Sequence, residues 1–360
     1  MTQKALIAMS GGVDSSVAAY LMQQRGYACT GCTMRLYDGA DLGLPQSEGC
    51  GSSRDADDAQ AVATSLGMPF TVFDCTHAFR EKVIDPFVKS YLAGETPNPC
   101  IACNRYLKFS ELYAQARTMG ADVLVTGHYA RVVQTPDGYV LKKGLDPTKD
   151  QSYVLYTLTQ EQLAHTFFPL GELRKSEVRE LAAQLGFDNA EKPDSQDICF
   201  VPDGNYADVV ERISGQASVP GNFIDAEGCV LGQHRGIMHY TIGQRKGLGL
   251  AFPEPRYVCA INAADNTVTI GKSEELNRWS LMACDFNWMS GVAPSSPVRC
   301  AAKTRYRQVE QPAWARVCGD GTVEVTFDEP QQGIAPGQSV VLYDGDVVLG
   351  GGIIMGDSVK

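Results

Sequence analysis

Residues 10–16, Ser-Gly-Gly-Val-Asp-Ser-Ser, have types and spacing suited to binding a phosphate group. They follow a short apolar run at 5–9 and open a helical pattern that ends at Gly26. Two adjacent glycines let a backbone turn tightly and approach a ligand, while serine hydroxyls and the first amides of a helix supply donors at its positive end. The heptad therefore predicts an anion site where a strand meets a helix.

The same heptad excludes the common phosphate loop that carries its own lysine. No Gly-Lys-Ser/Thr follows a four-residue spacer, so no loop lysine reaches a γ-phosphate and a different nucleotide chemistry is implied. A helix N-terminus rich in Ser and Asp that only caps itself is the alternative interpretation. The complete heptad directly after a strand favours the anion site.

Two cysteine pairs could bind a metal or exchange disulfides. Cys100 and Cys103 form a CxxC sequence after Thr-Pro-Asn-Pro, and these prolines favour a rigid, extended loop that presents the thiols. Cys29 and Cys32 lie in a strand pattern, where residues three apart face opposite sides of a sheet. A zinc or iron–sulfur site built from both pairs is therefore disfavoured, and no metal site is expected.

Cys199 stands alone in segment 192–200, which breaks the alternation of strands and helices and is expected to be a loop. A lone cysteine is more often a small buried apolar residue than a nucleophile. Two thiols from distant loops that meet beside a nucleotide would suit sulfur transfer, because one carries a persulfide and the other resolves it as a disulfide. Asp194 and Asp197 are candidate bases, with solvated loop acids as the alternative.

Length and composition limit the class of protein. The 360 residues, 44% of them apolar, predict two or three domains, and the net charge of −11 argues against nonspecific nucleic-acid binding, so no DNA partner is expected. No basic and apolar leader opens the chain and no apolar run reaches membrane-spanning length, so we expect a cytoplasmic protein without a membrane partner. Its twelve cysteines then indicate catalytic or metal-binding thiols rather than a disulfide framework.

Basic residues gather in one place despite the negative total. Arg299, Lys303, Arg305 and Arg307 all occupy odd positions, and no acidic residue lies between Met289 and Val309. If this segment is a strand, one of its faces is basic and could bind an anionic partner. A solvated strand face is an equally good interpretation.

The elements that must position these residues form an α/β pattern. Apolar runs at 5–9, 70–73 and 122–126 alternate with helical patterns, which predicts a doubly wound parallel sheet in the first two hundred residues. Ligands bind beyond the carboxyl ends of such strands, so the Ser10 loop, the segment around Met34 and the Gly127 turn should converge.

The pattern changes after the linker-like residues 202–205. Glycine-rich, strand-like segments follow, and after Asn277 short strands are separated by Asp-Gly turns at 320–321 and 344–345. We expect a catalytic domain at 1–203, a small central β-rich domain at 204–276 and a C-terminal β-barrel at 277–360.

Ordered motifs recur along the whole chain. After the heptad come Thr-Pro-Asn-Pro-Cys-Ile-Ala-Cys-Asn, Thr-Gly-His-Tyr, Lys-Asp-Gln-Ser-Tyr and Asp-Ile-Cys-Phe. His-Tyr-Thr-Ile-Gly-Gln-Arg-Lys-Gly-Leu-Gly, Lys-Thr-Arg-Tyr-Arg-Gln and Leu-Gly-Gly-Gly-Ile-Ile follow. Together they resemble the bacterial tRNA-specific 2-thiouridylases. The heptad alone would indicate only the wider PP-loop ATP pyrophosphatase group.

The resemblance implies a PP-loop, adenine nucleotide α-hydrolase-like N-terminal domain and an ATP-dependent sulfurtransferase. ATP would adenylate the C2 oxygen of uridine 34 in tRNA, and sulfur would then replace that oxygen. Cys199 would hold the persulfide, while Cys103, followed by Asn104 as in the family motif, would release the sulfur and end in a disulfide with Cys199. ATP, accompanied by Mg²⁺, would bind Ala8, Met9, Ser10, Gly11, Gly12, Val13, Asp14, Ser15, Met34 and Gly127.

The resemblance also implies tRNA contacts. Asn98, Pro99 and Cys100 would line the flipped-out target base. Some relatives carry Asp at the position of Cys100 as a proposed general acid or base, which leaves that role open here, and we favour Cys103 over Cys100 as the nucleophile. The other contacts would be His128, Lys149, Asp150, Gln151, Arg305, Tyr306 and Gln338.

The implied partners are tRNAs for Lys, Glu and Gln and a persulfide donor, either a cysteine desulfurase or a sulfur-relay protein. One alternative is a PP-loop ligase or synthetase that adenylates a small molecule. The other is a noncatalytic tRNA-binding protein, whose nucleotide loop is structural or acts as a sensor.

Overall fold

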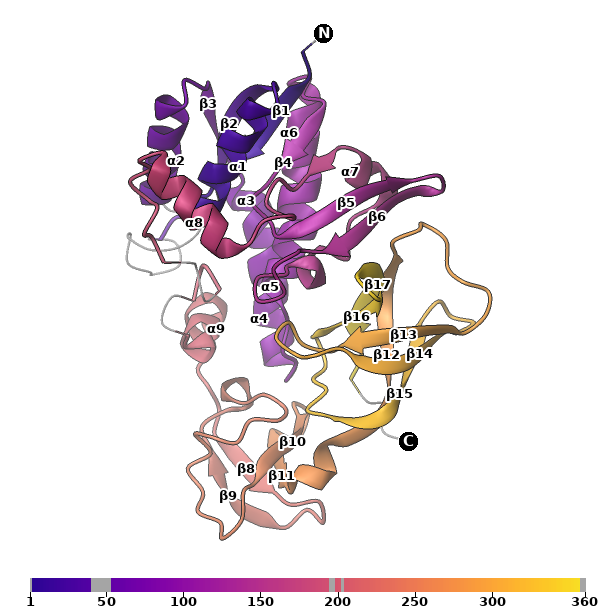
Figure 1. Ribbon diagram of the computed structural model, residues 1–360. Helices are drawn as coiled ribbons and strands as arrows, with labels where there is room; N and C mark the ends of the chain where they lie inside the picture. The colour runs from indigo at the N-terminus through magenta and orange to yellow at the C-terminus, as the bar shows by residue number, and fades with distance from the viewer. Residues whose placement is uncertain (1, 40–52, 194–197, 202–203, 357–360) are drawn as a thin grey trace.

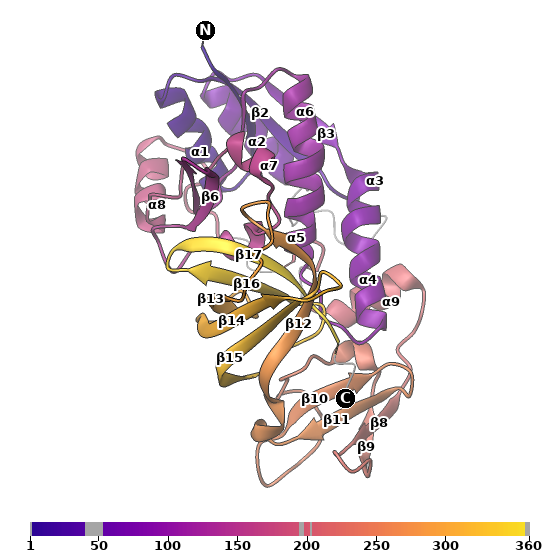
Figure 2. The same cartoon turned by 90° about the vertical axis from the view of Figure 1, so that its right-hand side faces the viewer.

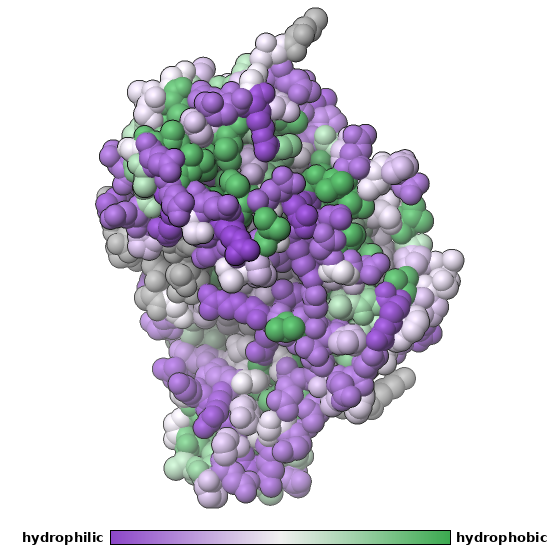
Figure 3. Space-filling model, viewed as in Figure 1, coloured by the Kyte–Doolittle hydropathy of each residue, from purple (hydrophilic) through white to green (hydrophobic). Residues whose placement is uncertain are grey.

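The chain forms three regions, an α/β region at the top of Figure 1, a central β-rich region at the bottom and a β-barrel beside them. The computed structural model describes residues 2–39, 53–193, 198–201 and 204–356. Candidate bases Asp194 and Asp197 lie outside the described residues. Most of the face in Figure 3 is hydrophilic, with green apolar patches mainly over the α/β region. In the described ranges, no helix is long and apolar enough to cross a membrane.

The α/β region is built on a five-stranded parallel sheet with the order β3-β2-β1-β4-β7. The strand order changes direction between β1 and β4, which is where ligands bind in sheets of this kind. The heptad follows β1 and the Gly127 turn follows β4, so the expected fold class is confirmed. The strands are β1 Lys4–Ala8, β2 Ala28–Arg35, β3 Phe70–Asp74, β4 Val123–Val125 and β7 Thr166–Phe167.

Helices cover both faces of the sheet because alternate residues of β1 point to opposite sides. Ala5 and Ile7 pack in one core with α1, α2 and α8, and Leu6 packs in another with α3, α4 and α6. Two π-helical stretches, Arg80–Ile84 and Cys103–Glu111, join α3 to α4 and α5 to α6. The helices are α1 Val13–Gln24, α2 Ser53–Ser65, α3 Thr76–Phe79, α4 Asp85–Leu92, α5 Pro99–Ala102, α6 Leu112–Thr118, α7 Gln160–Ala164, α8 Lys175–Gln184 and α9 Tyr206–Ser214.

Six strands form the expected C-terminal barrel in the order β12-β15-β14-β13-β16-β17, and pairing between β12 and β17 closes it (Figure 2). Both Asp-Gly turns connect antiparallel neighbours, as predicted. A hairpin from the α/β region, β5–β6, adds to β17 through Val347 and Lys142. The strands are β5 Ala130–Thr135, β6 Gly138–Lys143, β12 Asn277–Trp288, β13 Val298–Lys303, β14 Gln311–Val317, β15 Val323–Gln332, β16 Ser339–Asp344 and β17 Val347–Ile354.

The central region is a four-stranded sheet with the order β10-β11-β8-β9 around a small apolar core that contains Phe223 and Val258. A short 3₁₀ helix, Ile237–His239, follows β9. Helix α9 packs against α4 and connects this sheet to the α/β region. The strands are β8 Gly221–Ile224, β9 Val230–His234, β10 Tyr257–Asn262 and β11 Thr267–Gly271.

The expected basic strand face is only partly present. Strand β13 contains Arg299 and Lys303 but ends there, so Arg305 and Arg307 lie in the following turn. The turn forms because the side chain of Gln308 accepts hydrogen bonds from the backbone and hydroxyl of Thr304, both at 2.8 Å. The prediction of one continuous basic stripe is therefore wrong.

Thr96 is the point where the three regions meet. Its amide donates to Pro336 O of the barrel at 2.8 Å, and its carbonyl accepts from Gln338 Nε2 at 2.7 Å. The Thr96 hydroxyl lies 3.3 Å from that of Thr241 in the central region. The barrel and the central region are thus both fastened to the segment that leads into α5.

Phe87 on α4 is buried among aromatic rings from other elements, which makes it a sharp test of packing. Its ring lies 5.1 Å from Phe200 and 6.5 Å from Tyr206, centroid to centroid. We expect Phe87→Ala to lower the free energy of unfolding by about 3–5 kcal/mol, measured by urea denaturation. Val72→Ala, at a half-exposed position on β3, is the control with little effect. Similar losses in the two variants would contradict this account.

Candidate active site

The glycine loop, residues 10–16, turns between β1 and α1 and keeps its shape through internal hydrogen bonds. Ser15 Oγ accepts from the Ser10 amide at 3.1 Å and donates to Gly12 O at 3.0 Å. Ser16 Oγ donates to the same carbonyl at 3.1 Å. These two hydroxyls therefore shape the loop. The first amides of α1 have no side-chain cap from Gly12 and point toward any anion bound there.

Two glycines are required because the backbone passes very close to other elements. Gly11 has φ +71°, and a Cβ there would lie 2.5 Å from the carbonyl oxygen of Asp55 on α2. A Cβ on Gly127 would lie 2.9 Å from Asp14 C and Ser15 N at the start of α1. The loop and the turn after β4 therefore meet, as predicted, and the N-terminal part of α2 joins them, which was not predicted.

Asp14 at the start of α1 forms an ion pair with Lys175, which comes from α8 and not from the heptad. Lys175 Nζ lies 2.7 and 2.8 Å from the two carboxylate oxygens of Asp14, and Tyr129 OH donates to Asp14 at 2.7 Å. Lys175 is in turn positioned by its amide, which donates to Asp146 at 3.0 Å. This cluster holds the Asp14 side chain at the loop.

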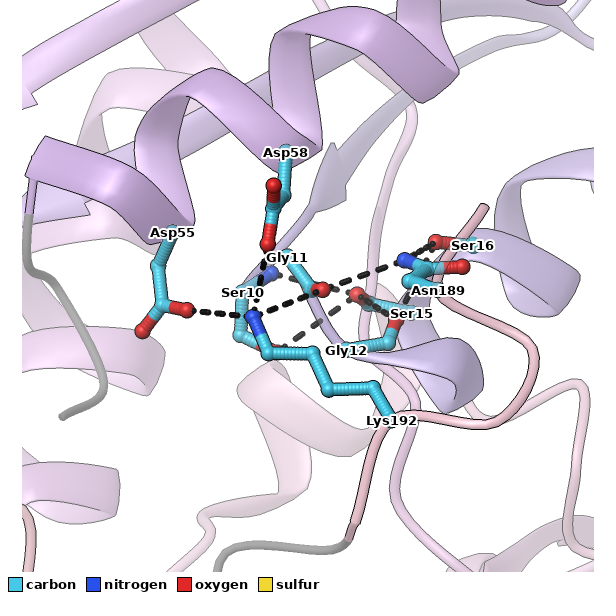
Figure 4. A network of polar contacts seen from close by, with 9 residues as sticks. All are labelled: Ser10, Gly11, Gly12, Ser15, Ser16, Asp55, Asp58, Asn189 and Lys192. Atoms are coloured by element: carbon cyan, nitrogen blue, oxygen red, sulfur yellow. Dashed lines mark hydrogen bonds and ion pairs between the residues drawn. The ribbon is translucent and has the colours of Figure 1, made fainter. Parts of the chain in front are cut away.

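A second lysine, Lys192, contacts the loop from the segment after α8 (Figure 4). Lys192 Nζ lies 2.8 Å from Asp55 Oδ1, 2.7 Å from Asp58 Oδ2 and 3.4 Å from Gly11 O. Asn189 Nδ2 donates to the same Gly11 carbonyl at 3.1 Å and to Ser16 Oγ at 2.9 Å. The segment after α8 is thereby fastened to the glycine loop.

Cys100 and Cys103 do not lie on an extended loop, and that prediction is wrong. Pro99 is the first residue of α5, where a proline lacks only an amide that would have no partner in the helix. Asn98 caps this helix by accepting from the Cys100 amide at 3.1 Å. Cys100 is exposed and Cys103 is half-buried, so the helix start presents one thiol to solvent and turns the other toward the core.

Cys199 and Cys103 pack against the same apolar core, which also contains Met34. Tyr37 OH donates to the Cys199 carbonyl at 2.7 Å, and the ring of Tyr37 stacks on Phe79. Helix α3, which ends at Phe79, contacts the π-helical stretch that begins at Cys103. Both thiols are therefore placed at the margin of one core on the Leu6 side of the sheet.

The other CxxC pair lies on β2, as predicted, and is inert. Cys32 is fully buried, and burial raises the pKa of its thiol far above the ordinary value. Burial also raises the pKa of Cys29 to about 11. Within the described ranges, no three His, Cys, Asp or Glu side chains are grouped so as to hold a metal ion.

Comparison with known sequences identifies the family. Residues 3–203 match the model described as tRNA methyl transferase HUP domain, 207–272 the tRNA methyl transferase PRC-barrel domain and 278–354 the Aminomethyltransferase beta-barrel domain. A protein of Clostridioides difficile described as tRNA-specific 2-thiouridylase MnmA is 48% identical over 356 residues, 98% of each chain. The chain belongs to the tRNA-specific 2-thiouridylase family.

A second relative agrees with this membership. A relative from Lachnoclostridium phytofermentans with the same description is 47% identical over 98% of this chain and 99% of its own. Among solved structures, a 4-thiouridine synthetase in complex with RNA and ATP has a TM-score of 0.37 and 19% identity, covering 56% of this chain and 46% of that one. Likeness at that level carries no conclusion about function.

Several residues that the family resemblance assigns to tRNA contact have structural partners within the chain. Arg305 Nη2 donates to Ile242 O at 2.9 Å and also to Gly333 O, so it joins the barrel to the central region. Gln338 is bonded to Thr96, as described above. Gln151 Oε1 accepts from the Tyr129 amide at 3.0 Å.

Asp150 and Tyr306 lie together beside Cys100. The Asp150 carboxylate accepts from the Gly144 amide at 3.0 Å and from the Ser152 hydroxyl at 2.9 Å, and its carbonyl accepts from Tyr306 OH at 3.1 Å. Tyr306 is still 37% exposed, and Cys100 is close enough to affect its pKa, which burial raises to about 12. Lys149 is half-buried next to this group.

The sequence analysis missed the residues that are distant in the sequence but lie next to the loop in the fold. Nothing near the heptad indicates Asp55, Asp58, Asn189 or Lys192, and the turn after β4 gives no sign that Tyr129 reaches Asp14. The acidic first turn of α2 was a visible signal, but it equally fits ordinary helix stabilisation. Only the fold shows that this turn lies against Gly11.

His128 provides a test of the buried side of the site. It packs against the rings of Phe109 and Phe168, with Nδ1 2.6 Å from Thr126 Oγ1, and burial, aided by Lys108, lowers its pKa well below the ordinary value. The unfolded chain therefore binds a proton near pH 6.5 that the folded chain does not bind.

The contribution of neutral His128 is fully present above about pH 6.5 and is lost as the pH falls below it, by at most about 1.4 kcal/mol per pH unit. We expect His128→Gln to lose less stability than the unchanged chain between pH 7.5 and 5.5. Urea denaturation at the two pH values measures this difference. Equal losses would show that His128 does not stay neutral in the fold.

Proposed function

We propose that this chain is an ATP-dependent tRNA-uridine 2-sulfurtransferase, which replaces the C2 oxygen of uridine 34 by sulfur. The observation that carries the proposal is identity of 46–48% along the whole chain to relatives described as tRNA-specific 2-thiouridylases. The site supports it physically, because an anion loop lies at the switch point of the sheet and two half-buried thiols, Cys103 and Cys199, pack against one core on one face of that sheet.

The glycine loop fits the phosphates of ATP. Among the described residues, a Cβ at Gly12 would meet only Ser10 Oγ, at 3.6 Å, so these residues leave room beside the loop for a ligand. Asn189 is 94% buried and its Oδ1 has no hydrogen-bond partner among the described residues, which suits a polar ligand nearby. ATP would contact Ala8 to Ser15, Met34 and Gly127. Mg²⁺ would be held mainly by the phosphates, because Mg²⁺ commonly takes only one or two protein carboxylates.

ATP would convert the C2 oxygen of the uracil ring, which is a poor leaving group, into part of AMP, which is a good one. Transfer of its adenylyl group to the C2 oxygen of the uracil ring releases pyrophosphate and leaves AMP as the group to be displaced. Asp14, held by Lys175 and Tyr129, and the amides at the start of α1 would position the phosphates for that transfer.

Cys199 and Cys103 would then carry the sulfur. The terminal sulfur of a persulfide on Cys199 attacks C2, and AMP leaves with the C2 oxygen. The Cys103 thiolate attacks the Cys199 sulfur, so that the bond between the two sulfurs of the adduct breaks and 2-thiouridine is released. The resulting Cys103–Cys199 disulfide needs a dithiol reductant before the next turnover.

The tRNA would lie across the barrel and the α5 region. Asn98, Pro99 and Cys100 would surround the extruded base, and the partly exposed ring of Tyr306, whose hydroxyl donates to the Asp150 carbonyl, could stack on a base. His128, Lys149, Gln151, Arg305 and Gln338 would support this surface, since most of them are bonded to neighbouring backbone.

The cellular setting follows from this reaction. The acceptors would be tRNAs for Lys, Glu and Gln in the cytoplasm, and the persulfide would come from a cysteine desulfurase or a sulfur-relay protein. We assign catalysis to residues 1–203, a supporting role to 204–276 and tRNA grip to the barrel at 277–360.

Replacing either thiol tests the function directly. We expect Cys103→Ala and Cys199→Ala each to abolish formation of 2-thiouridine, because the two thiols perform different steps, while tRNA binding persists. Mass spectrometry of nucleosides after incubation with tRNA, ATP and a persulfide donor measures the product, and gel retardation measures binding.

Cys229→Ala is the matched control, because Cys229 is an exposed thiol directly before β9 in the central region. This variant should keep full activity. Full activity in either Cys103→Ala or Cys199→Ala would overturn the sulfur-transfer role. Incorporation of adenylate into a small molecule without any thiolation would favour a PP-loop ligase instead.

A further inference from the structure

The central region has an open hollow whose lining combines two arginines with apolar side chains. Its volume is about 410 Å³, which is in the range of small-molecule binding sites. Its charged lining residues are Arg245, Glu254 and Arg256, and the other residues around it are leucine, phenylalanine and proline. Arg245 belongs to the sequence motif at 239–249, to which the proposed reaction gives no task.

The loop that carries Arg245 is held in one shape. Gln244 Oε1 accepts a hydrogen bond from the Thr241 amide at 3.0 Å, and Gln244 Nε2 donates to the Lys246 carbonyl at 3.0 Å. Leu248 is buried between two glycines, whose φ angles of +77° and +70° let the chain turn on either side of it. Arg245 and Lys246 are exposed on this loop, so their charges are presented to solvent from a fixed backbone.

The guanidinium of Arg256 is positioned by an aromatic ring and not by an acceptor. Its Cζ lies 5.6 Å from the centroid of the Phe252 ring. Its Nε is buried, and no described group accepts a hydrogen bond from this nitrogen. A charged donor without an acceptor is unfavourable where water is excluded, so an anion that enters the hollow would improve the surroundings of Arg256.

The positive charge at the hollow is less offset than the charge of other arginines in this acidic chain. Arg299 on the barrel, for example, is ion-paired with a carboxylate of β15 at 2.6 Å. In the part of the chain that the structure describes, Arg245 and Arg256 form no ion pair. The carboxylate of Glu254 also lines the hollow, but it lies 3.7 Å from Lys272 Nζ, which offsets its charge. The hollow is therefore suited to an anion.

The loop with Arg245 begins against the part of the barrel that is proposed to contact tRNA. A Cβ on Gly243 would lie 3.2 Å from Arg305 Nη2, and this nitrogen donates to the preceding carbonyl at 2.9 Å. The next barrel residue, Tyr306, is close enough to Cys100 for their charges to interact. Arg245 follows Gly243 by two positions, so their Cα atoms lie within about 7 Å of each other. The basic loop consequently borders the proposed tRNA surface.

We propose that Arg245 and Arg256 bind backbone phosphate oxygens of tRNA at this hollow, so that the central region holds the substrate away from the target base. Arginine matches phosphate better than lysine does, because its planar fork offers two parallel donors. The chain as a whole is acidic and repels a polyanion, so cations without internal carboxylate partners are needed where it meets RNA. The inference rests on the proposed function, because it takes tRNA to be the substrate.

The first test measures the affinity of the full chain for tRNA between about 50 and about 200 mM KCl. We expect Arg245→Gln and Arg256→Gln each to weaken binding roughly tenfold, the size of one charge-assisted contact. Each should also lower the slope of log K against log salt by about one, because a phosphate contact is lost. Arg256→Lys keeps the charge, so it should keep the slope and lose only part of the affinity.

Arg80→Gln is the matched control. Arg80 is also exposed, but it lies in the α/β region and is ion-paired with Asp85 at 2.6 Å. The same change of charge at this position should leave both the affinity for tRNA and the salt slope as they are. A loss equal to that of Arg245→Gln would show that only the total charge matters, and it would overturn the proposal.

The second test identifies the phosphate and its source. Ethylation of tRNA with ethylnitrosourea blocks binding wherever the protein contacts the modified phosphate. We expect at least one phosphate to interfere with binding by the unchanged chain and no longer to interfere in Arg245→Gln or Arg256→Gln. Inorganic phosphate offers the same oxygens, and calorimetry with inorganic phosphate should show no saturable binding that either substitution removes.

The other outcomes overturn the proposal. Unchanged salt slopes or unchanged interference patterns in both glutamine variants would do so and leave the proposed function intact, provided that the unchanged chain binds tRNA. Saturable binding of inorganic phosphate, lost in the variants while tRNA binding persists, would assign the hollow to a free anion. Failure of the unchanged chain to bind tRNA would overturn both proposals. Urea denaturation checks folding, and Arg245→Gln, at an exposed position, carries the test if Arg256→Gln does not fold.

Discussion

The close approach of Gly11 to α2 is the constraint on which the site depends. Because no side chain fits between Gly11 and the Asp55 carbonyl, the loop, the helix and the segment after α8 can meet at one backbone carbonyl. Gly11 O receives both Asn189 and Lys192 from that segment. The strands β1 and β4 then set where this junction lies on the sheet, and Gly127 allows α1 to lie directly against the turn after β4.

Two lysines offset much of the carboxylate charge around the loop. Carboxylates beside an anion site are unfavourable, yet Asp14 lies on one side of the loop and Asp55 and Asp58 on the other. Each side has a lysine from a distant segment, Lys175 or Lys192, within hydrogen-bond distance. The heptad contains no lysine, but folding brings two lysines from distant segments, Lys175 and Lys192, next to it.

The sequence predicted features that depend on local pattern. The heptad, the parallel sheet and the Asp-Gly hairpins of the barrel were foreseeable because glycine pairs, apolar alternation and turn residues act over a few positions. Lys192 and Asn189 were not, because nothing local connects them to Gly11. The β5–β6 hairpin was missed despite the Asp-Gly turn ending at Gly138, and the helix at Cys100 was missed because Pro99 also suits a helix start.

The contacts of Thr96 limit how this chain can be divided or recombined. Thr96 lies two positions before Asn98, the cap of α5, which carries Cys100 and leads directly into the π-helical stretch that begins at Cys103. Thr96 is bonded to both the barrel and the central region. Removing or exchanging either region would take partners away from the residues that begin this helix. The barrel therefore cannot be exchanged independently of the α/β region. Substitutions in its 336–338 turn must preserve the hydrogen bonds to Thr96, because Thr96 leads into the helix that carries Cys100.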